Sequence, residues 1–222
     1  QKTAYEISLG LVGSEMCIRD RCMGGGGREK WASVVPFGGI NPIMSTNPFA
    51  FSMPGSEINP VSSDFAISTI AAGKIAVAKA NNTPLPDGAI IDSDGHASRN
   101  PDDFYAGGAL LPAAGPKGSG MGIIAELVGN AMLGSALEFN WLIICMRVDA
   151  FQPISQYKAA VSKLSKQVRK SSPATGHQKV LMPGDLEEKK YQDCVNSGYV
   201  SVSNNIAKLL IDAAQLVGQK GW

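Results

Sequence analysis

The fold is constrained most by a glycine-rich turn, Gly115-Pro116-Lys117-Gly118-Ser119-Gly120-Met121-Gly122, which opens directly into an apolar segment. The apolar spacing predicts a helix over residues 121–133. The glycine spacing is not the dinucleotide-binding fingerprint, since the third glycine is missing at its required offset and no clear buried strand precedes the turn. Because Lys117 precedes Gly118, Gly120 and Gly122 instead of following them, the turn is not a P-loop either. What remains is an anion site at a helix N-terminus, or glycines that allow tight helix packing.

A second helix start is predicted upstream, where Ser62-Ser63-Asp64 precedes apolar residues at helical spacing. The pattern predicts a helix over residues 64–81, with Ser63 or Asp64 as its N-cap. The free N–H groups of such a turn would make it a further candidate anion site.

The remaining segments are predicted to be a mixture of strands and helices. Short strands are predicted over residues 31–35, 49–53, 89–91 and 142–148, and amphipathic helices over 155–170 and 204–217. No strict βαβ rhythm is present, so the predicted class is α/β or mixed α+β.

Composition excludes several classes of protein. The 222 residues carry 20 Lys+Arg against 19 Asp+Glu, so no global field attracts nucleic acid or an anionic membrane. No apolar run approaches the length of a membrane span, and four cysteines in a chain of this length do not form a disulfide scaffold. His96 and His177 are predicted in solvated loops, and no metal site is expected. We expect a soluble, cytoplasmic globular protein.

Residues 1–30 differ in character from the rest of the chain. Residues 13–21 resemble an in-frame translation of an adapter used in sequencing libraries, so residues 1–30 are interpreted as an artefactual or disordered leader. Residues 31–222 form the credible chain, and Cys17 and Cys22 carry no metal or redox meaning.

Four short motifs of residues 31–222 are informative through their order and spacing. The first is Pro36-Phe37-Gly38-Gly39 with Thr46-Asn47-Pro48, and the second is Pro60-Val61-Ser62-Ser63-Asp64-Phe65-Ala66 with Gly73-Lys74. The third runs from Leu85-Pro86-Asp87-Gly88 through Gly107-Gly108 to Lys117-Gly118-Ser119-Gly120-Met121, and the fourth is Met182-Pro183-Gly184-Asp185. Each motif alone is weak, but together they resemble the malate/L-lactate dehydrogenase family of the sulfolactate and ureidoglycolate dehydrogenase type. The resemblance runs from Trp31 to the C-terminus.

The resemblance implies a non-Rossmann, mixed-sheet NAD(P)-binding fold, truncated at its N-terminus, over residues 31–222. It implies an oxidoreductase that transfers a hydride between the nicotinamide of NAD or NADP and C2 of a small 2-hydroxy or 2-oxo acid such as malate or lactate. It also implies a homodimer. Some members reduce cyclic imines, so imine (ketimine) reduction is an alternative activity.

The resemblance also assigns residues by position. Asp64 would orient the catalytic histidine, although it is equally well placed as a helix N-cap. The cofactor would be contacted by Pro60, Val61, Ser62, Ser63, Asp64, Phe65, Ala66, Pro116, Lys117, Gly184, Asp185 and Leu186.

The chain departs from the family at its chemical centre. The proton-donating histidine of a Ser-His-Gly string and the arginine that binds the substrate carboxylate belong upstream of the matched region, and neither is found there. We therefore expect this polypeptide to be catalytically inactive, and a nucleotide-binding domain without catalysis is the second alternative.

Overall fold

The computed structural model describes residues 19–26, 32–55, 60–134, 140–202 and 204–218. By its internal contacts the chain divides into two compact units, Gln1–Gly184 (unit 1) and Asp185–Trp222 (unit 2).

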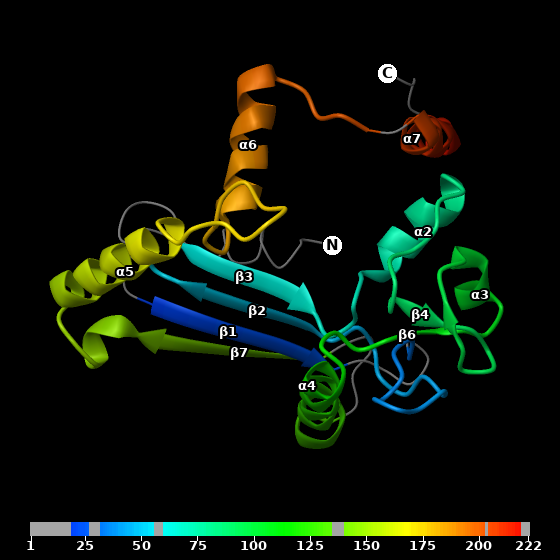
Figure 1. Ribbon diagram of the computed structural model, residues 1–222, viewed down its shortest axis with the longest axis horizontal. Helices are drawn as coiled ribbons and strands as arrows, with labels where there is room; N and C mark the ends of the chain where they lie inside the picture. Colours follow the sequence, from blue (N-terminus) through cyan, green and yellow to red (C-terminus); the bar gives the residue numbers. More distant parts are fainter. Residues whose placement is uncertain (1–18, 27–31, 56–59, 135–139, 203, 219–222) are drawn as a thin grey trace. The chain divides into compact units, whose positions relative to one another are not determined.

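Unit 1 is built around a four-stranded sheet with the order β3-β2-β1-β7 (Figure 1). The strands are β1 (Arg19–Gly26), β2 (Pro48–Met53), β3 (Val61–Ala66) and β7 (Asn140–Arg147), and all neighbours pair antiparallel. The predicted strands over 49–53 and 142–148 are confirmed as β2 and β7. Antiparallel pairing leaves no βαβ unit in this sheet, in agreement with the predicted non-Rossmann architecture.

Strand β1 comes from the segment interpreted as a leader. It lies between β2 and β7, with Met23 opposite both Ala50 and Ile143. Residues 19–26 are therefore ordered in the sheet, which differs from the expected disorder. Residues 1–18 and 27–31, including Trp31 of the predicted strand over 31–35, lie outside the described residues, and the artefactual origin of the leader stays a prediction. Of residues 32–35, Val34 alone forms β-bridges, to Met44 and Leu110.

The predicted helix over 64–81 is wrong in its first half. Val61–Ala66 forms β3, in register with β2 so that Phe65 faces Phe49 and Val61 faces Met53. The ring of Phe65 stacks on those of Phe49 and Phe51, with centroids 6.1 and 6.2 Å apart. Such cross-strand pairs stabilise a strand against a competing helical pattern. The helix α2 begins only at Ala72 and ends at Ala80, and its N-cap makes no side-chain hydrogen bond.

A second, three-stranded antiparallel sheet has the order β5-β4-β6, formed by Ala97–Ser98, Ile90–Ile91 and Ala109–Leu110. Strand β4 confirms the prediction over 89–91, whereas the short helix α3 (Pro101–Tyr105) was not predicted. The main core cluster gathers here. Its fully buried large side chains are Val34, Met44, Ile67, Ile75, Leu85, Ile90 and Leu110.

Helix α4 spans Pro116–Glu126 and continues as the π-helix η3 (Leu127–Met132). The helix predicted over 121–133 therefore exists but begins earlier, because Pro116 occupies the first turn, where its missing N–H costs nothing. Glycine is required at two places on this helix. A Cβ at Gly118 would overlap the carbonyl oxygen of Ala113, and one at Gly122 would lie 2.8 Å from Met44 Sδ. The packing interpretation of the glycines thus holds for Gly118 and Gly122.

The last part of unit 1 contains the short 3₁₀ turn η4 (Val148–Ala150) and the amphipathic helix α5 (Ile154–Arg169), which confirms the helix predicted over 155–170. Helix α5 is anchored by the Tyr157 hydroxyl, which donates to the carbonyl oxygen of Pro54 at 2.8 Å. Unit 2 consists of α6 (Asp185–Ser197), which was not predicted, and α7 (Asn204–Leu216), which confirms the last predicted helix. Among the residues that the structure describes, no helix has the length and apolar character needed to cross a membrane.

Candidate functional site

The predicted cofactor residues 60–66 run along β3, an edge strand of the larger sheet. Alternation along the strand places Ser62 and Asp64 on one face and Phe65 on the other. The Ser62 hydroxyl lies 2.9 Å from that of Ser52 on β2, so a polar cross-strand pair stands beside Asp64. The face of the sheet that carries Ser52, Ser62 and Asp64 is therefore polar at this end.

Asp64 is an exposed carboxylate in the middle of β3. No described residue forms a hydrogen bond with it, and partial burial raises the pKa of its carboxyl above the ordinary value. The N-cap interpretation is wrong because no helix begins here, so the helix-terminus anion site predicted at Ser62-Ser63-Asp64 is not formed. The Asp64 carboxylate is left available to a group from outside the strand.

Gly184 is brought to the first residues of the same strand. A Cβ at this position would lie 3.7 Å from the carbonyl oxygen of Ser62 and 3.8 Å from that of Pro60. The backbone φ of +94° is in the region that favours glycine. Three predicted cofactor residues, Pro60, Ser62 and Gly184, thus meet at one place.

The other predicted cluster, Pro116-Lys117, lies beyond the opposite end of β3. The backbone N–H of Ala113, just before α4, donates to the carbonyl oxygen of Ile67 at 2.7 Å, and Ile67 directly follows β3. Six strand residues span about 20 Å. The predicted residues therefore follow the length of β3 as an extended candidate site, with Gly184 at one end, Asp64 in the middle and Lys117 past the other end.

At the start of α4, the predicted anion site lacks the free N–H donors expected of a helix N-terminus. The first-turn N–H groups are already used, because those of Gly118 and Ser119 donate to the carbonyl oxygens of Ala113 and Gly115, both at 3.1 Å. The Lys117 side chain is exposed, and no ion pair involving it is recorded among the described residues. The lysine charge, rather than free backbone N–H groups, is what this turn offers to a phosphate.

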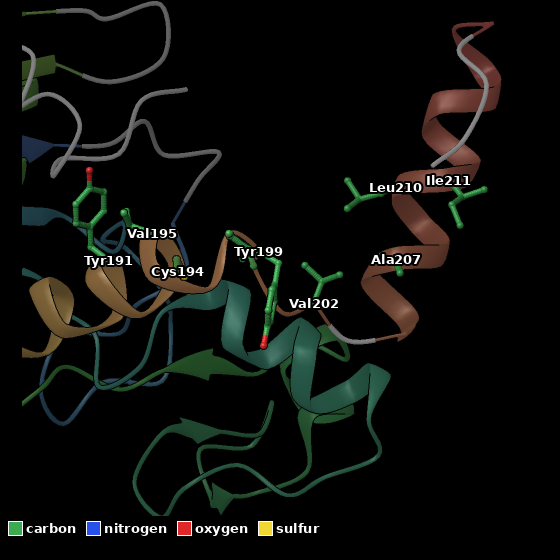
Figure 2. Close-up of a pocket in the computed structure, with 10 residues that line it drawn as sticks. Tyr191, Cys194, Val195, Tyr199, Val202, Ala207, Leu210 and Ile211 are labelled. Carbon is green, nitrogen blue, oxygen red and sulfur yellow. The ribbon is translucent and has the colours of Figure 1, made fainter.

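Asp185 and Leu186 open helix α6 in unit 2. In the same unit, a cavity of about 830 Å³ lies between α6, α7 and their connection (Figure 2). Its lining is largely apolar and includes Tyr191, Val195, Tyr199, Val202, Leu210 and Ile211. It contains none of the predicted cofactor residues and no pair of groups suited to proton transfer.

The histidines are placed as predicted, in exposed loops. His96 Nδ1 lies 3.5 Å from the Asp92 carboxylate, and Asp94 completes a group whose donor atoms lie within 4.8 Å of one another. The turn itself explains this grouping, because Asp92 Oδ1 accepts the backbone N–H groups of Asp94 and His96. Those bonds lower the pKa of Asp92, with the His96 bond contributing most.

Sequence reasoning missed a polar network between β2 and α4. Glu126 Oε1 accepts from the backbone N–H of Ser45 at 2.9 Å and from Asn47 Nδ2 at 2.8 Å. The available signal was that Glu126 is the single acidic residue between Asp103 and Glu138, inside a segment read as apolar.

These features define a class: a mixed α/β protein with an antiparallel sheet and an extended site that offers a carboxylate and a lysine, without a Rossmann turn. The family model for "Malate/L-lactate dehydrogenase" matches residues 7–210, and this chain belongs to that family. The match includes part of the segment interpreted as a leader.

Curated relatives include enzymes with different substrates. The chain is 37% identical over 127 residues to the Delta(1)-pyrroline-2-carboxylate reductase of Agrobacterium fabrum, covering 57% of this chain and 33% of that one. It is 27% identical over 219 residues to the NAD(+) ureidoglycolate dehydrogenase of Escherichia coli O157:H7, covering 92% and 59%. It is 33% identical over 109 residues to the NADP(+) (2R)-3-sulfolactate dehydrogenase of Chromohalobacter salexigens, covering 49% and 32%.

Solved structures agree on the fold. The sulfolactate dehydrogenase of Methanocaldococcus jannaschii superposes with a TM-score of 0.76 at 24% identity, covering 97% of this chain and 62% of that one. The predicted non-Rossmann dehydrogenase fold is thereby confirmed. The chain spans between 32% and 59% of the length of such curated relatives.

Proposed function

We propose that this chain is the cofactor-binding part of an NAD- or NADP-dependent oxidoreductase. The whole enzyme transfers a hydride between the nicotinamide and C2 of a small 2-hydroxy or 2-oxo acid, of the malate or lactate type. The observation that carries the proposal is the alignment of Gly184, Asp64 and Lys117 along β3 in a chain of this family. Relatives that use NAD(+) and NADP(+) support either dinucleotide.

The residues present fit an extended dianionic cofactor. Lys117 supplies a cation for a phosphate, and Gly184 lets a ligand approach the backbone at Pro60 and Ser62 because no side chain fills that space. Asp64 would accept a hydrogen bond from a histidine and fix its tautomer. The bound cofactor supplies the hydride; this chain binds and orients it. Asp185 and Leu186 are proposed to complete the site.

A second candidate activity is reduction of a cyclic imine. The 37% and 39% identities to pyrroline-2-carboxylate reductases exceed the 27% identity to ureidoglycolate dehydrogenase, although over shorter segments. In both activities the carbon that receives the hydride is attached to a carboxylate, so one site can serve either substrate class.

We further propose that the polypeptide as written binds cofactor without turnover, as a nucleotide-binding domain. A 2-oxo acid needs a proton donor at its oxygen when hydride arrives. The two histidines of the sequence lie in exposed loops, and among the described residues no hydrogen bond or ion pair joins either of them to Asp64. The complete enzyme is proposed to be a cytoplasmic homodimer.

The test is titration of the 222-residue chain with NADH and with NADPH, followed by fluorescence. Lys117→Ala is expected to weaken binding by about tenfold, since it removes a charge-assisted contact. Lys163→Ala is the control, because it removes an equal charge from the exposed side of α5. No saturable binding of either dinucleotide, or equal losses in both variants, would refute the proposed site.

Turnover is measured in the same preparation with pyruvate, oxaloacetate and pyrroline-2-carboxylate. Cofactor oxidation at the background rate is the expected result. Oxidation above background with any of these substrates would overturn the proposed inactivity and would identify the substrate class.

A further inference from the structure

A hydrogen-bonded network in unit 1 joins α4 to the start of β2 and contains none of the proposed binding residues. Its centre is Glu126, the last residue of α4, and its members include Ser45 and Asn47, which precede β2. Ser45 and Asn47 are buried, with exposed fractions of 5% and 0%. A side chain as polar as Asn47 can be fully buried only if its amide is satisfied.

The side-chain amide of Asn47 and its backbone N–H all have partners. Its Nδ2 donates to Glu126 Oε1 at 2.8 Å and to the carbonyl oxygen of Gly122 at 3.3 Å. Its Oδ1 accepts from the Ser45 hydroxyl at 2.6 Å, and its backbone N–H donates to the same hydroxyl oxygen at 3.4 Å. Asn47 is thus connected to the last two turns of α4.

The network also holds Asn47 in an unfavourable backbone conformation. Its φ is +38°, in the left-handed region, and Pro48 follows it. A residue before proline is normally extended, and a side chain at positive φ is strained. The hydrogen bonds to Glu126 and Gly122 compensate for this strain, so the start of β2 depends on contact with α4.

Glu126 is suited to this position because a carboxylate only accepts hydrogen bonds. Oε1 receives the Ser45 N–H and Asn47 Nδ2, and Oε2 receives Asn130 Nδ2 at 2.7 Å. Three donors therefore meet two acceptor oxygens with no conflict between donors. Glutamine could keep the two bonds at Oε1 if Asn130 turned its amide around.

The network is linked to the proposed site through both of the elements that it joins, β2 and α4. Strand β2, which begins directly after Asn47, pairs with β3 along its whole length and places Ala50 opposite Asp64. Helix α4 carries Lys117 nine residues before Glu126, which is about 13 Å along the axis. The first turn of α4 makes a further contact, in which Ser119 Oγ accepts the N–H of Phe37 at 3.0 Å. A shift of the helix would weaken this contact too.

We propose that Glu126 is a positioning residue: by fixing the end of α4 on the start of β2, it sets the place of Lys117 relative to Asp64 and thereby the affinity for the dinucleotide. The inference rests on the proposed function for its ligand. Its structural part, that Glu126 holds α4 in place, can be tested without any ligand.

The experiment compares the full chain with Glu126→Ala, Glu126→Asp and Glu126→Gln. Asn100→Ala is the matched control, because it removes the N-cap hydrogen bond of α3 and lowers stability away from α4. Affinity for NADH and NADPH is measured at low temperature, well below the melting temperature of each variant. Glu126→Asp keeps the charge but shortens the side chain, and it serves if Glu126→Ala fails to fold.

Glu126→Ala or Glu126→Asp is expected to raise the dissociation constant by about tenfold. Glu126→Gln and Asn100→Ala are expected to stay within about twofold of the original chain. Amide hydrogen exchange at Phe37, Ser45 and Gly118 is expected to accelerate in Glu126→Ala and not in Asn100→Ala. Rescue by glutamine is a result that a general loss of stability would not produce.

Two results are damaging in different ways. If Glu126→Ala and Glu126→Asp bind the dinucleotide as the original chain does, Glu126 is a stabilising residue only and the inference is overturned. If the original chain binds neither dinucleotide, the proposed function fails, and the positioning of α4 is then decided by exchange alone: unchanged exchange in Glu126→Ala overturns it.

Discussion

At the scale of single residues, Asp64 shows how the strand sets the chemistry of a carboxylate. Burial on β3 raises its pKa, so the folded state binds the proton more tightly than the unfolded state. The resulting contribution to stability is fully present below the unfolded pKa and is lost as pH rises through the folded pKa. Asp64→Asn is therefore expected to stabilise the chain at pH about 7, by about 0.5 kcal/mol because solvent screens the exposed group. Thermal unfolding as a function of pH measures this, and the gain should disappear below pH about 4.

The pKa of Asp92 is shifted in the opposite direction to that of Asp64, so the same experiment should give the opposite dependence of stability on pH. The N–H of His96 and that of Asp94 lower its pKa, so its contribution is present above the unfolded pKa and is lost as pH falls through the folded pKa. Asp92→Asn is expected to destabilise the chain at neutral pH and to become neutral in acid. Identical pH profiles for the two variants would contradict both assignments.

At the scale of elements, two glycines of α4 allow the effect of close packing on stability to be distinguished from the effect of helix propensity. Gly118→Ala is expected to destabilise by about 2 kcal/mol or more, because the new Cβ meets the backbone carbonyl of Ala113, which cannot move independently. Gly120→Ala, on the same helix with open space around its Cα, is expected to stabilise by about 0.5 to 1 kcal/mol. Denaturant unfolding measures both changes. Equal effects of the two substitutions would show that helix propensity alone governs these positions.

Much of the fold could be predicted from local pattern, and the failures have one physical cause. Helices α5 and α7 carry a continuous amphipathic period and were predicted nearly to their ends. Strand β3 was not, because its identity depends on the rings of Phe49 and Phe51 on a strand that pairs with it. Strand β1 also owes its conformation to two neighbours, β2 and β7. A single-sequence pattern does not contain pairing between distant segments.

At the scale of the whole molecule, the candidate site also contains some contacts that the sequence predicts and others that it does not. The family resemblance named Pro60, Ser62 and Gly184 as cofactor residues, and the structure brings those three together. The contact between Asn47 and Glu126 could not be predicted, since it joins residues far apart in sequence through side chains whose types occur in many turns and helices. The free backbone N–H groups expected beside Lys117 are not found, for a local reason: neighbouring carbonyl groups already accept those of Gly118 and Ser119.

The division of the chain at residue 184 leads to the last prediction. All the buried hydrophobic residues that the structure describes belong to unit 1, and neither α6 nor α7 in unit 2 buries a side chain. Two helices of 13 residues each, with no buried side chain in either, contribute little to cooperative unfolding. A chain ending at Gly184 is therefore expected to keep its melting temperature within about 2 °C of the 222-residue chain.

Differential scanning calorimetry of the two chains decides the matter, with Leu85→Ala in the full chain as a positive control for loss of core. Leu85 is 1% exposed in the main cluster, so its truncation is expected to cost about 2 to 5 kcal/mol and to lower the melting temperature clearly. A fall of similar size after removal of residues 185–222 would mean that unit 2 stabilises the fold through apolar contacts beyond its own two helices. The retained temperature would instead show that unit 1 folds alone, and nucleotide titration of the shorter chain would then measure what Asp185 and Leu186 contribute to binding.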